Sequence, residues 1–227
     1  MTNRPVPAAP TSGRTSRPTA TPAAAREIDA VLYDFGNVLV GWDPYGAFDG
    51  VGRDLVDTFF ADVDFRVLNH ERDAGGTWAD ARERVAGTHP HHVALLDRYV
   101  ERFPATLTGP VDGSEELVRE LRDLGLRLYG LTNWSAELYP HAAPAAPATA
   151  LMEDVVVSGR EGLAKPDPAI FALAVERFGL DPARTLFTDD SPANIDAAAR
   201  LGLRTHLFEG TAGLRAALHD LGVPVAR

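Results

Sequence analysis

The sequence predicts an α/β fold, a Rossmann-like parallel sheet core that carries an inserted α-helical cap domain. From Ile28 onwards, short apolar runs alternate with longer amphipathic segments, a pattern typical of the strand and helix units of a parallel sheet. Roughly ninety residues separate the first two expected strands, whereas one crossover helix needs only about a dozen. We therefore expect an extra domain between these strands.

Five apolar segments are expected to form the sheet, namely 30–34, 127–132, 154–158, 185–189 and 204–208. The segments between them have the end signals of helices. One helix is expected to begin at 112–114 and to end at Gly125, because glycine is common just past the last helical turn. Two more are expected to begin near the proline-containing segments 166–168 and 191–192, since proline suits a first turn.

The chain is divided by composition into three parts. Residues 1–26 are rich in Pro, Ala, Thr and Ser and are predicted to form a disordered tail, because they carry too little apolar surface to fold. The α/β core is expected to comprise 27–42 and 109–227, with the cap at 43–108. Within the cap, apolar residues at helical spacing predict a small bundle with helices over 52–72, 77–86 and 91–103.

Charge and composition limit the partners and the compartment. The formal net charge of −10 disfavours a nucleic acid or an anionic membrane surface as the partner, because both would be repelled on average. No apolar stretch approaches the roughly eighteen residues of a membrane span. The absence of cysteine excludes disulfides and thiolate chemistry and fits a cytoplasmic protein. The oligomeric state stays open.

Polar residues stand where the expected strands or their loops end. Asp34, Thr132 and the pair Asp189-Asp190 each close an apolar strand, and Lys165 lies in a loop after another. In open parallel sheets, ligands bind beyond the carboxyl ends of the strands. We therefore expect these side chains to converge on one site although they are far apart in the sequence.

These four positions, in this order and with an insertion after the first, resemble the motifs of the haloacid dehalogenase superfamily over nearly everything after Ile28. The resemblance implies that Asp34 is a nucleophile, which would attack phosphorus and form an aspartyl-phosphate. A hard divalent cation, with Mg²⁺ favoured, would remove the repulsion between the carboxylate and the phosphate. Its implied ligands are the Asp34 carboxylate, the Gly36 carbonyl and Asp190, with Asp189 assisting directly or through water.

The same resemblance assigns the phosphate-binding groups. Thr132 would donate its hydroxyl to a phosphoryl oxygen, and Asn133 would add a donor. Lys165 would neutralise charge on both the phosphoryl group and Asp34. The predicted function is therefore a Mg²⁺-dependent phosphatase that acts on a small phosphomonoester, with a sugar phosphate as the first candidate substrate.

Gly36 departs from the commonest phosphatase pattern, in which a second Asp stands two residues after the nucleophile and protonates the leaving group. Gly36 keeps a backbone carbonyl for the metal but supplies no acid, and such acid–base assistance contributes about 10² to 10⁴ in rate. One alternative is a metal-free 2-haloacid dehalogenase that uses Asp34 as its nucleophile, although the acidic pair Asp189-Asp190 would repel a carboxylate substrate. A second alternative is a catalytically inactive phosphate-binding protein, which Gly36 alone motivates.

Four further features have two interpretations each. Trp42 and Trp78 are candidates for the substrate pocket, with core or hinge packing as the alternative. Asn194 would support Asp189-Asp190 by a hydrogen bond or would face solvent. The polar run 69–73 indicates a solvated helix face, with a contribution from the cap to substrate recognition as the alternative.

Overall fold

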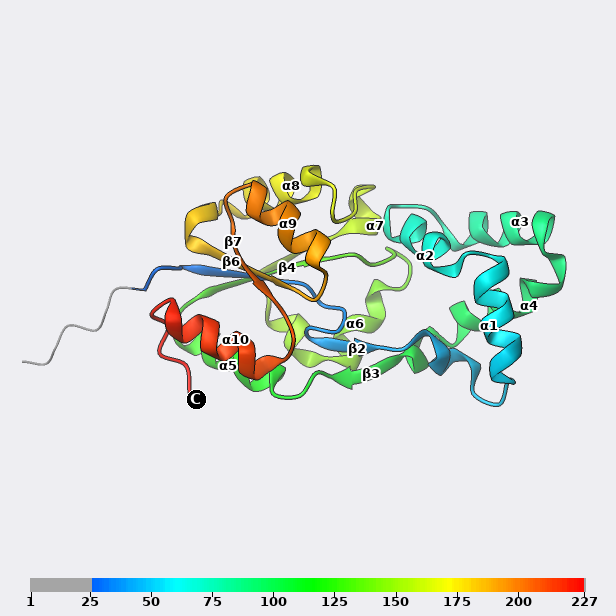
Figure 1. The fold of residues 1–227 in the computed structure, drawn as a ribbon, viewed down its shortest axis with the longest axis horizontal. Coiled ribbons are helices and arrows are strands. Elements are labelled where there is room, and N and C mark those ends of the chain that lie inside the picture. Colours follow the sequence, from blue (N-terminus) through cyan, green and yellow to red (C-terminus); the bar gives the residue numbers. More distant parts are fainter. Residues whose placement is uncertain (1–25, 227) are drawn as a thin grey trace, which may run out of the picture.

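The computed structural model describes residues 26–226, and a five-stranded sheet forms its centre (Figure 1). The order is β5-β4-β1-β6-β7, and all neighbouring strands are parallel. The strands are β1 (Ala30–Tyr33), β4 (Arg127–Thr132), β5 (Asp154–Val157), β6 (Thr185–Asp189) and β7 (Arg204–Leu207). The predicted α/β class and all five expected strands are confirmed. The tail predicted for 1–26 lies, except for Arg26, outside the described residues.

Helices cover both faces of this sheet. Alternate residues of the strands point to opposite faces, so that Val31 and Leu32 belong to different clusters of buried apolar side chains. In Figure 1, α8 and α9 lie over one face and α5 and α10 over the other. The bounds of these helices are α5 (Ser114–Asp123), α8 (Pro168–Phe178), α9 (Pro192–Arg200) and α10 (Thr211–Asp220). The central strands are therefore buried on both sides, which explains their continuous apolar character.

The ends of the core helices follow the predicted signals. The chain passes through Gly125 with a φ of 77° directly after α5 and Leu124, a conformation that glycine adopts without steric cost. Pro168 and Pro192 each occupy the first position of their helix. The carboxylate of Asp167 accepts a hydrogen bond from Ala169 N at 2.8 Å and so caps α8.

The insertion between β1 and β4 is helical, as expected, and lies to one side of the core in Figure 1. Its helices are α1 (Arg53–Asp62), α2 (Phe65–Asp73), α3 (Trp78–Thr88) and α4 (Val93–Glu101). A two-stranded antiparallel ribbon of β2 (Val40–Trp42) and β3 (Leu107–Pro110) connects it to the core. This ribbon was not predicted from the sequence, because both strands are too short to show a clear alternation of apolar and polar residues.

The single helix expected over 52–72 is wrong, because two helices, α1 and α2, meet at Val63 and Asp64. Asp64 has a φ of 45°, and its carboxylate accepts a hydrogen bond from Val67 N, which starts α2. Aspartate tolerates this left-handed conformation better than most residues. The apolar spacing gives no sign of this break, because Phe59 before it and Phe65 after it both face the same aromatic cluster, with ring centroids 6.0 Å apart.

Shorter elements complete the fold. The short helices α6 (Ala142–Ala145) and α7 (Ser158–Glu161) flank β5 in the sequence. Single 3₁₀ turns are found at Pro44–Phe48, Pro90–His92, Phe103–Thr106, Tyr139–His141, Pro147–Leu151 and Pro182–Arg184. In the part of the chain that the structure describes, no helix has both the length and the apolar character needed to cross a membrane.

Candidate active site

The carboxyl ends of three neighbouring strands bring the predicted residues together. Asp34 directly follows β1 and is buried, while Thr132 ends β4 and Asp189 ends β6. β1 lies between β4 and β6 with all three parallel, so these three positions meet at one edge of the sheet. The backbone N–H of Asp34 donates to Thr188 O at 3.0 Å, which fixes the start of the loop that follows β1.

Lys165 reaches this edge from the loop between α7 and α8. Its Nζ lies 2.8 Å from Asp34 Oδ1 and 2.6 Å from Asp189 Oδ2, with only 1% of the side chain exposed. Asn133 holds this loop in place, because its Nδ2 donates to Lys165 O at 2.9 Å and its Oδ1 accepts from Lys165 N at 2.8 Å. The Asn133 carboxamide thus positions Lys165, and its direct contact with phosphate stays a prediction.

The buried charges do not balance. Burial raises the pKa of Asp34 to about 7; the charges of Asp189 and Asp190 add to this rise, and Lys165 opposes it. Burial alone would lower the pKa of Lys165, but the charges of Asp34 and Asp189 outweigh it and raise that pKa. One ammonium therefore faces three carboxyl groups, so a further positive charge would stabilise their ionised forms.

Three carboxylates could hold that charge as a metal ion. Asp34, Asp189 and Asp190 each offer an oxygen, and these oxygens lie within 4.8 Å of one another. Asp190 is exposed as a residue, but partial desolvation of its carboxyl group and the charge of Asp189 raise the pKa of that group. Hard oxygen donors with excess negative charge fit a divalent cation such as Mg²⁺. The carbonyl of Gly36 as a further ligand stays a prediction.

Asp189 is the most fully engaged of the three carboxylates. Besides Lys165, it accepts hydrogen bonds from Ser191 N at 2.8 Å and from Asn194 Nδ2 at 2.9 and 3.0 Å. The expected support from Asn194 is therefore confirmed. With its oxygens occupied in this way, Asp189 is better suited to anchor Lys165 than to take several metal contacts, which leaves Asp34 and Asp190 as the more accessible ligands.

Two polar groups complete the edge of the site. The hydroxyl of Thr132 is buried and has no hydrogen-bond partner among residues 26–226, so it is available to a ligand. Asn37 was missed by the sequence analysis: its Nδ2 donates to Asp190 Oδ2 at 3.4 Å, and its φ is 55°. The signal was present, since asparagine directly after Gly36 is one of the few residues that adopt this conformation readily.

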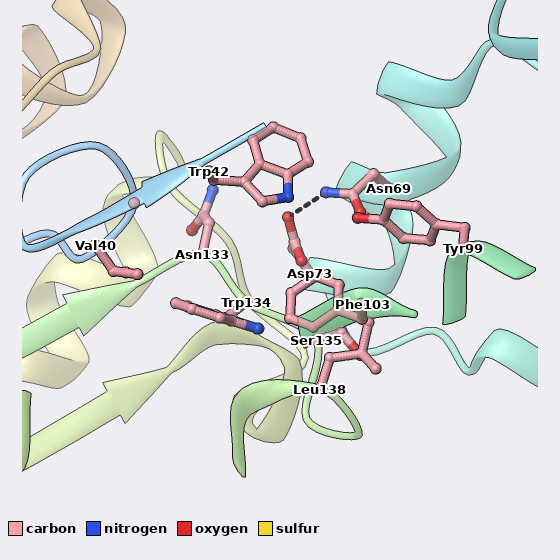
Figure 2. A pocket seen from close by; sticks show the side chains of 11 residues that line it. Val40, Trp42, Asn69, Asp73, Tyr99, Phe103, Asn133, Trp134, Ser135 and Leu138 are labelled. Atoms are coloured by element: carbon pink, nitrogen blue, oxygen red, sulfur yellow. Dashed lines mark hydrogen bonds between the residues drawn. The ribbon is translucent and has the colours of Figure 1, made fainter. Parts of the chain in front are cut away.

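Gly36 and Asn133 line a pocket between the core and the helical insertion (Figure 2). Trp42 lines it, and its contact with a substrate stays a prediction. Trp78 is not among the lining residues, because its Nε1 donates to Ser135 Oγ at 3.1 Å and the indole packs against Tyr99. The walls are mainly apolar or aromatic, and the lining residues are Gly36, Val40, Trp42, Asn69, Asp73, Tyr99, Phe103, Asn133, Trp134, Ser135 and Leu138.

The interpretation of 69–73 as a solvated face is wrong for Asn69 and Asp73, which line this pocket. In Figure 2 the Asp73 carboxyl group lies among the lining side chains, where Asn69 Nδ2 donates to its Oδ2 at 3.1 Å. The spacing contained a usable signal. Phe65, Asn69 and Asp73 follow one another at intervals of four residues and share a helix face, and Phe65 is buried. This face of α2 points inward, because the end of α2 docks on the core.

Comparison with known proteins identifies the family. The model of the haloacid dehalogenase-like hydrolase family matches residues 23–202, which is most of the chain. Among curated relatives, the sesquiterpene phosphatase astK of Aspergillus oryzae is 25% identical over 184 residues, with 77% of this chain and 86% of the relative covered. Flavin mononucleotide hydrolase 1 of Arabidopsis thaliana is 28% identical over 116 residues, 51% of this chain. The chain spans only 47% of that second relative.

Solved structures share the fold. The HAD family enzyme BT-2542 of Bacteroides thetaiotaomicron superimposes with a TM-score of 0.67 at 22% identity, covering 82% of this chain and 96% of that enzyme. A further structure of this enzyme holds magnesium and inorganic phosphate. The L-2-haloacid dehalogenase of Xanthobacter autotrophicus has a TM-score of 0.59 at 19% identity, covering 78% of this chain and 76% of the dehalogenase. With the family match and the assembled cluster of Asp34, Lys165, Asp189 and Asp190, the chain belongs to the haloacid dehalogenase-like hydrolases.

Proposed function

We propose that this hydrolase is a Mg²⁺-dependent phosphatase that cleaves a small phosphomonoester through an aspartyl-phosphate on Asp34. The observation that carries the proposal is the surplus of negative charge around Asp34, where three carboxylates meet within 4.8 Å and Lys165 is the one cation that pairs with them among the described residues. A bound divalent cation would offset this charge and draw the phosphate dianion towards the nucleophile.

The chain's own residues then have separate tasks. Asp34 attacks phosphorus from the side opposite the leaving oxygen; the phosphorus–oxygen bond to the leaving group breaks as the carboxylate–phosphorus bond forms. Lys165 and the hydroxyl of Thr132, which has no hydrogen-bond partner within residues 26–226, stabilise charge on the phosphoryl oxygens. Water then attacks the aspartyl-phosphate, which releases inorganic phosphate and restores the Asp34 carboxylate.

Dehalogenation is the less favoured function although dehalogenases share the fold. Displacement of halide from carbon by Asp34 would need no metal, so Asp190 would have no cation to bind, whereas Asp189 would still anchor Lys165. Exposed Asp190 would also repel the carboxylate of a 2-haloacid. An inactive phosphate-binding protein is disfavoured as well, because the short distances of Lys165 to Asp34 and Asp189, together with the three clustered carboxylates, support a reactive site.

The lining of the pocket indicates which phosphomonoesters should be tested as substrates. Its aromatic and aliphatic walls would bury a ring or an apolar chain, and Asn69 and Asp73 offer it a few polar contacts. Relatives are named as phosphatases of a sesquiterpene and of N-acetylmuramic acid 6-phosphate. A substrate panel should therefore contain prenyl, aryl and sugar phosphates. We further propose a cytoplasmic location, which the cysteine-free sequence supports.

The test is phosphate release from this panel with Mg²⁺ or with a chelator, beside halide release from 2-haloacids. We expect release that depends on Mg²⁺ and that Asp34→Asn abolishes. Asp29→Asn is the matched control, because Asp29 is an exposed aspartate that precedes β1 at the opposite edge of the sheet. Halide release without a metal would support the dehalogenase instead, and turnover of neither class would exclude both enzymes.

A further inference from the structure

We propose that Asp73, on the helical insertion, is the acid–base residue that protonates the leaving-group oxygen and later activates water. The proposal rests on the phosphatase function proposed above. It assigns to α2 the task that the first motif does not perform, because Gly36 has no side chain.

The structure shows that Gly36 leaves its position empty. A Cβ built on Gly36 would meet no atom within 4 Å in the described part of the chain, and its φ is not in the left-handed region. A Cβ therefore has room at this position, but Gly36 supplies no side chain and hence no acid. Gly36 instead borders the pocket that Asp73 also lines, so the two positions face the same space.

Asp73 is held in place at the junction of the insertion and the core. It is the last residue of α2, and the following loop packs on the core, where a Cβ built on Gly75 would lie only 3.0 Å from Gly162 Cα. Trp78 N donates to Glu137 at 3.2 Å and Trp78 Nε1 to Ser135. These contacts hold the end of α2 beside the loop that follows Thr132 and beside the loop that leads to Lys165.

The surroundings of Asp73 suit a proton donor better than an ion pair. Asn69 Nδ2 is its side-chain partner, and within residues 26–226 no lysine, arginine or histidine forms an ion pair with it. Burial raises the pKa of Asp73 to about 7, with a contribution from the Asp34 charge, against the opposing effects of the Ser135 backbone and Lys165. An acid–base catalyst works best when its pKa lies near the working pH.

The proposed steps balance. As Asp34 bonds to phosphorus and the bond to the leaving oxygen breaks, the Asp73 proton moves to that oxygen and the alcohol departs. The Asp73 carboxylate then takes a proton from the water that attacks the aspartyl-phosphate. Inorganic phosphate leaves, Asp34 regains its carboxylate, and Asp73 regains its proton.

The test compares two ring-bearing substrates of similar size, 4-nitrophenyl phosphate and benzyl phosphate, with Mg²⁺ present. 4-Nitrophenolate leaves without a proton, whereas benzyl alkoxide needs one. For Asp73→Asn we expect kcat/KM on benzyl phosphate to fall about 10²- to 10⁴-fold, with a much smaller loss on 4-nitrophenyl phosphate. The variant should also release 4-nitrophenolate in a burst, because the hydrolysis of the aspartyl-phosphate then lacks its base.

Asp54→Asn is the matched control, since Asp54 is an exposed aspartate on α1 of the same insertion. Adding Gly36→Asp to Asp73→Asn should recover benzyl phosphate hydrolysis at least tenfold. An equal loss on both substrates, or no loss on either, would overturn the role of Asp73 while leaving the phosphatase intact. Absence of Mg²⁺-dependent phosphate release by the wild-type protein would overturn both proposals.

Discussion

The Nζ of Lys165 lies 2.6 Å from Oδ2 of Asp189, and both side chains are buried. A buried ion pair of this kind is costly to break, because removing one partner leaves an uncompensated charge away from water. The same ammonium also contacts Asp34 at 2.8 Å. Stability and the proposed chemistry therefore depend on one side chain.

Replacing Lys165 tests this dependence. Lys165→Met should lower the free energy of unfolding by about 3–5 kcal/mol and abolish phosphate release, as measured by urea denaturation and by activity. Arg177→Met is the control, because Arg177 pairs with Glu161 in a more exposed setting, where such a pair contributes about 0.2–1 kcal/mol. Equal destabilisation by the two substitutions would contradict the special cost of the buried pair.

Removing the carboxylate of Asp190 should weaken Mg²⁺ binding and at the same time stabilise the metal-free protein. Mg²⁺ at a hundredfold excess over its dissociation constant stabilises a protein by about 2.7 kcal/mol, so Tm of the wild type should rise with Mg²⁺. For Asp190→Asn the rise should be largely lost, while Tm without metal should increase because repulsion among the carboxylates falls. Asp196→Asn, an exposed change on α9, should keep the wild-type response.

Replacing Thr132 should lower the activity without lowering the stability of the fold appreciably. Its hydroxyl is buried without a partner among the described residues. Thr132→Val should therefore lower the free energy of unfolding by less than about 1 kcal/mol, and an increase is equally consistent with the missing partner. Loss of a donor to the phosphoryl oxygens should lower kcat about 10²- to 10³-fold. Thr188→Val removes an equally buried, unpartnered hydroxyl from β6 and should keep near-normal activity; a comparable loss there would argue against a specific role for Thr132.

The raised pKa of Asp73 should make the stability of the fold depend on pH. Its folded-state pKa of about 7 lies above the ordinary value of 3.8, so the folded state binds more protons than the unfolded state between these values. The contribution of Asp73 to stability therefore falls as pH rises through this window. Asp73→Asn should raise Tm more at pH 8 than at pH 4. Thermal melts without metal test this, and a gain independent of pH would count against the raised pKa.

Most of the core and its site could be predicted from local patterns. The strand ends at Asp34, Thr132 and Asp189 could be read from apolar runs that stop at a polar residue, and the parallel sheet required them to meet. Lys165 has no such local signal, so it depended on family resemblance. Asn194 was proposed as support for Asp189, and the structure shows the two hydrogen bonds.

The features of the insertion were harder to predict from the sequence, because they depend on a local backbone break and on how the insertion packs on the core. The break at Asp64 is a local backbone event inside an uninterrupted apolar pattern. Asn69 and Asp73 belong to a polar run that looks solvated, and only the docking of α2 turns them into a pocket. Trp78 illustrates the converse, because an aromatic residue in the cap was a reasonable pocket candidate until its indole was found bonded to Ser135.

The sequence by itself determined the α/β class, the order of the strands along the chain and the positions of Asp34, Thr132 and Asp189, since burial patterns and strand ends are local properties. Only the tertiary structure decided which polar groups lie together: Lys165 between Asp34 and Asp189, and Asp73 in the same pocket as Gly36. The physical reason is that long-range pairing of charges and the packing of an inserted domain depend on three-dimensional distances that residue spacing does not encode.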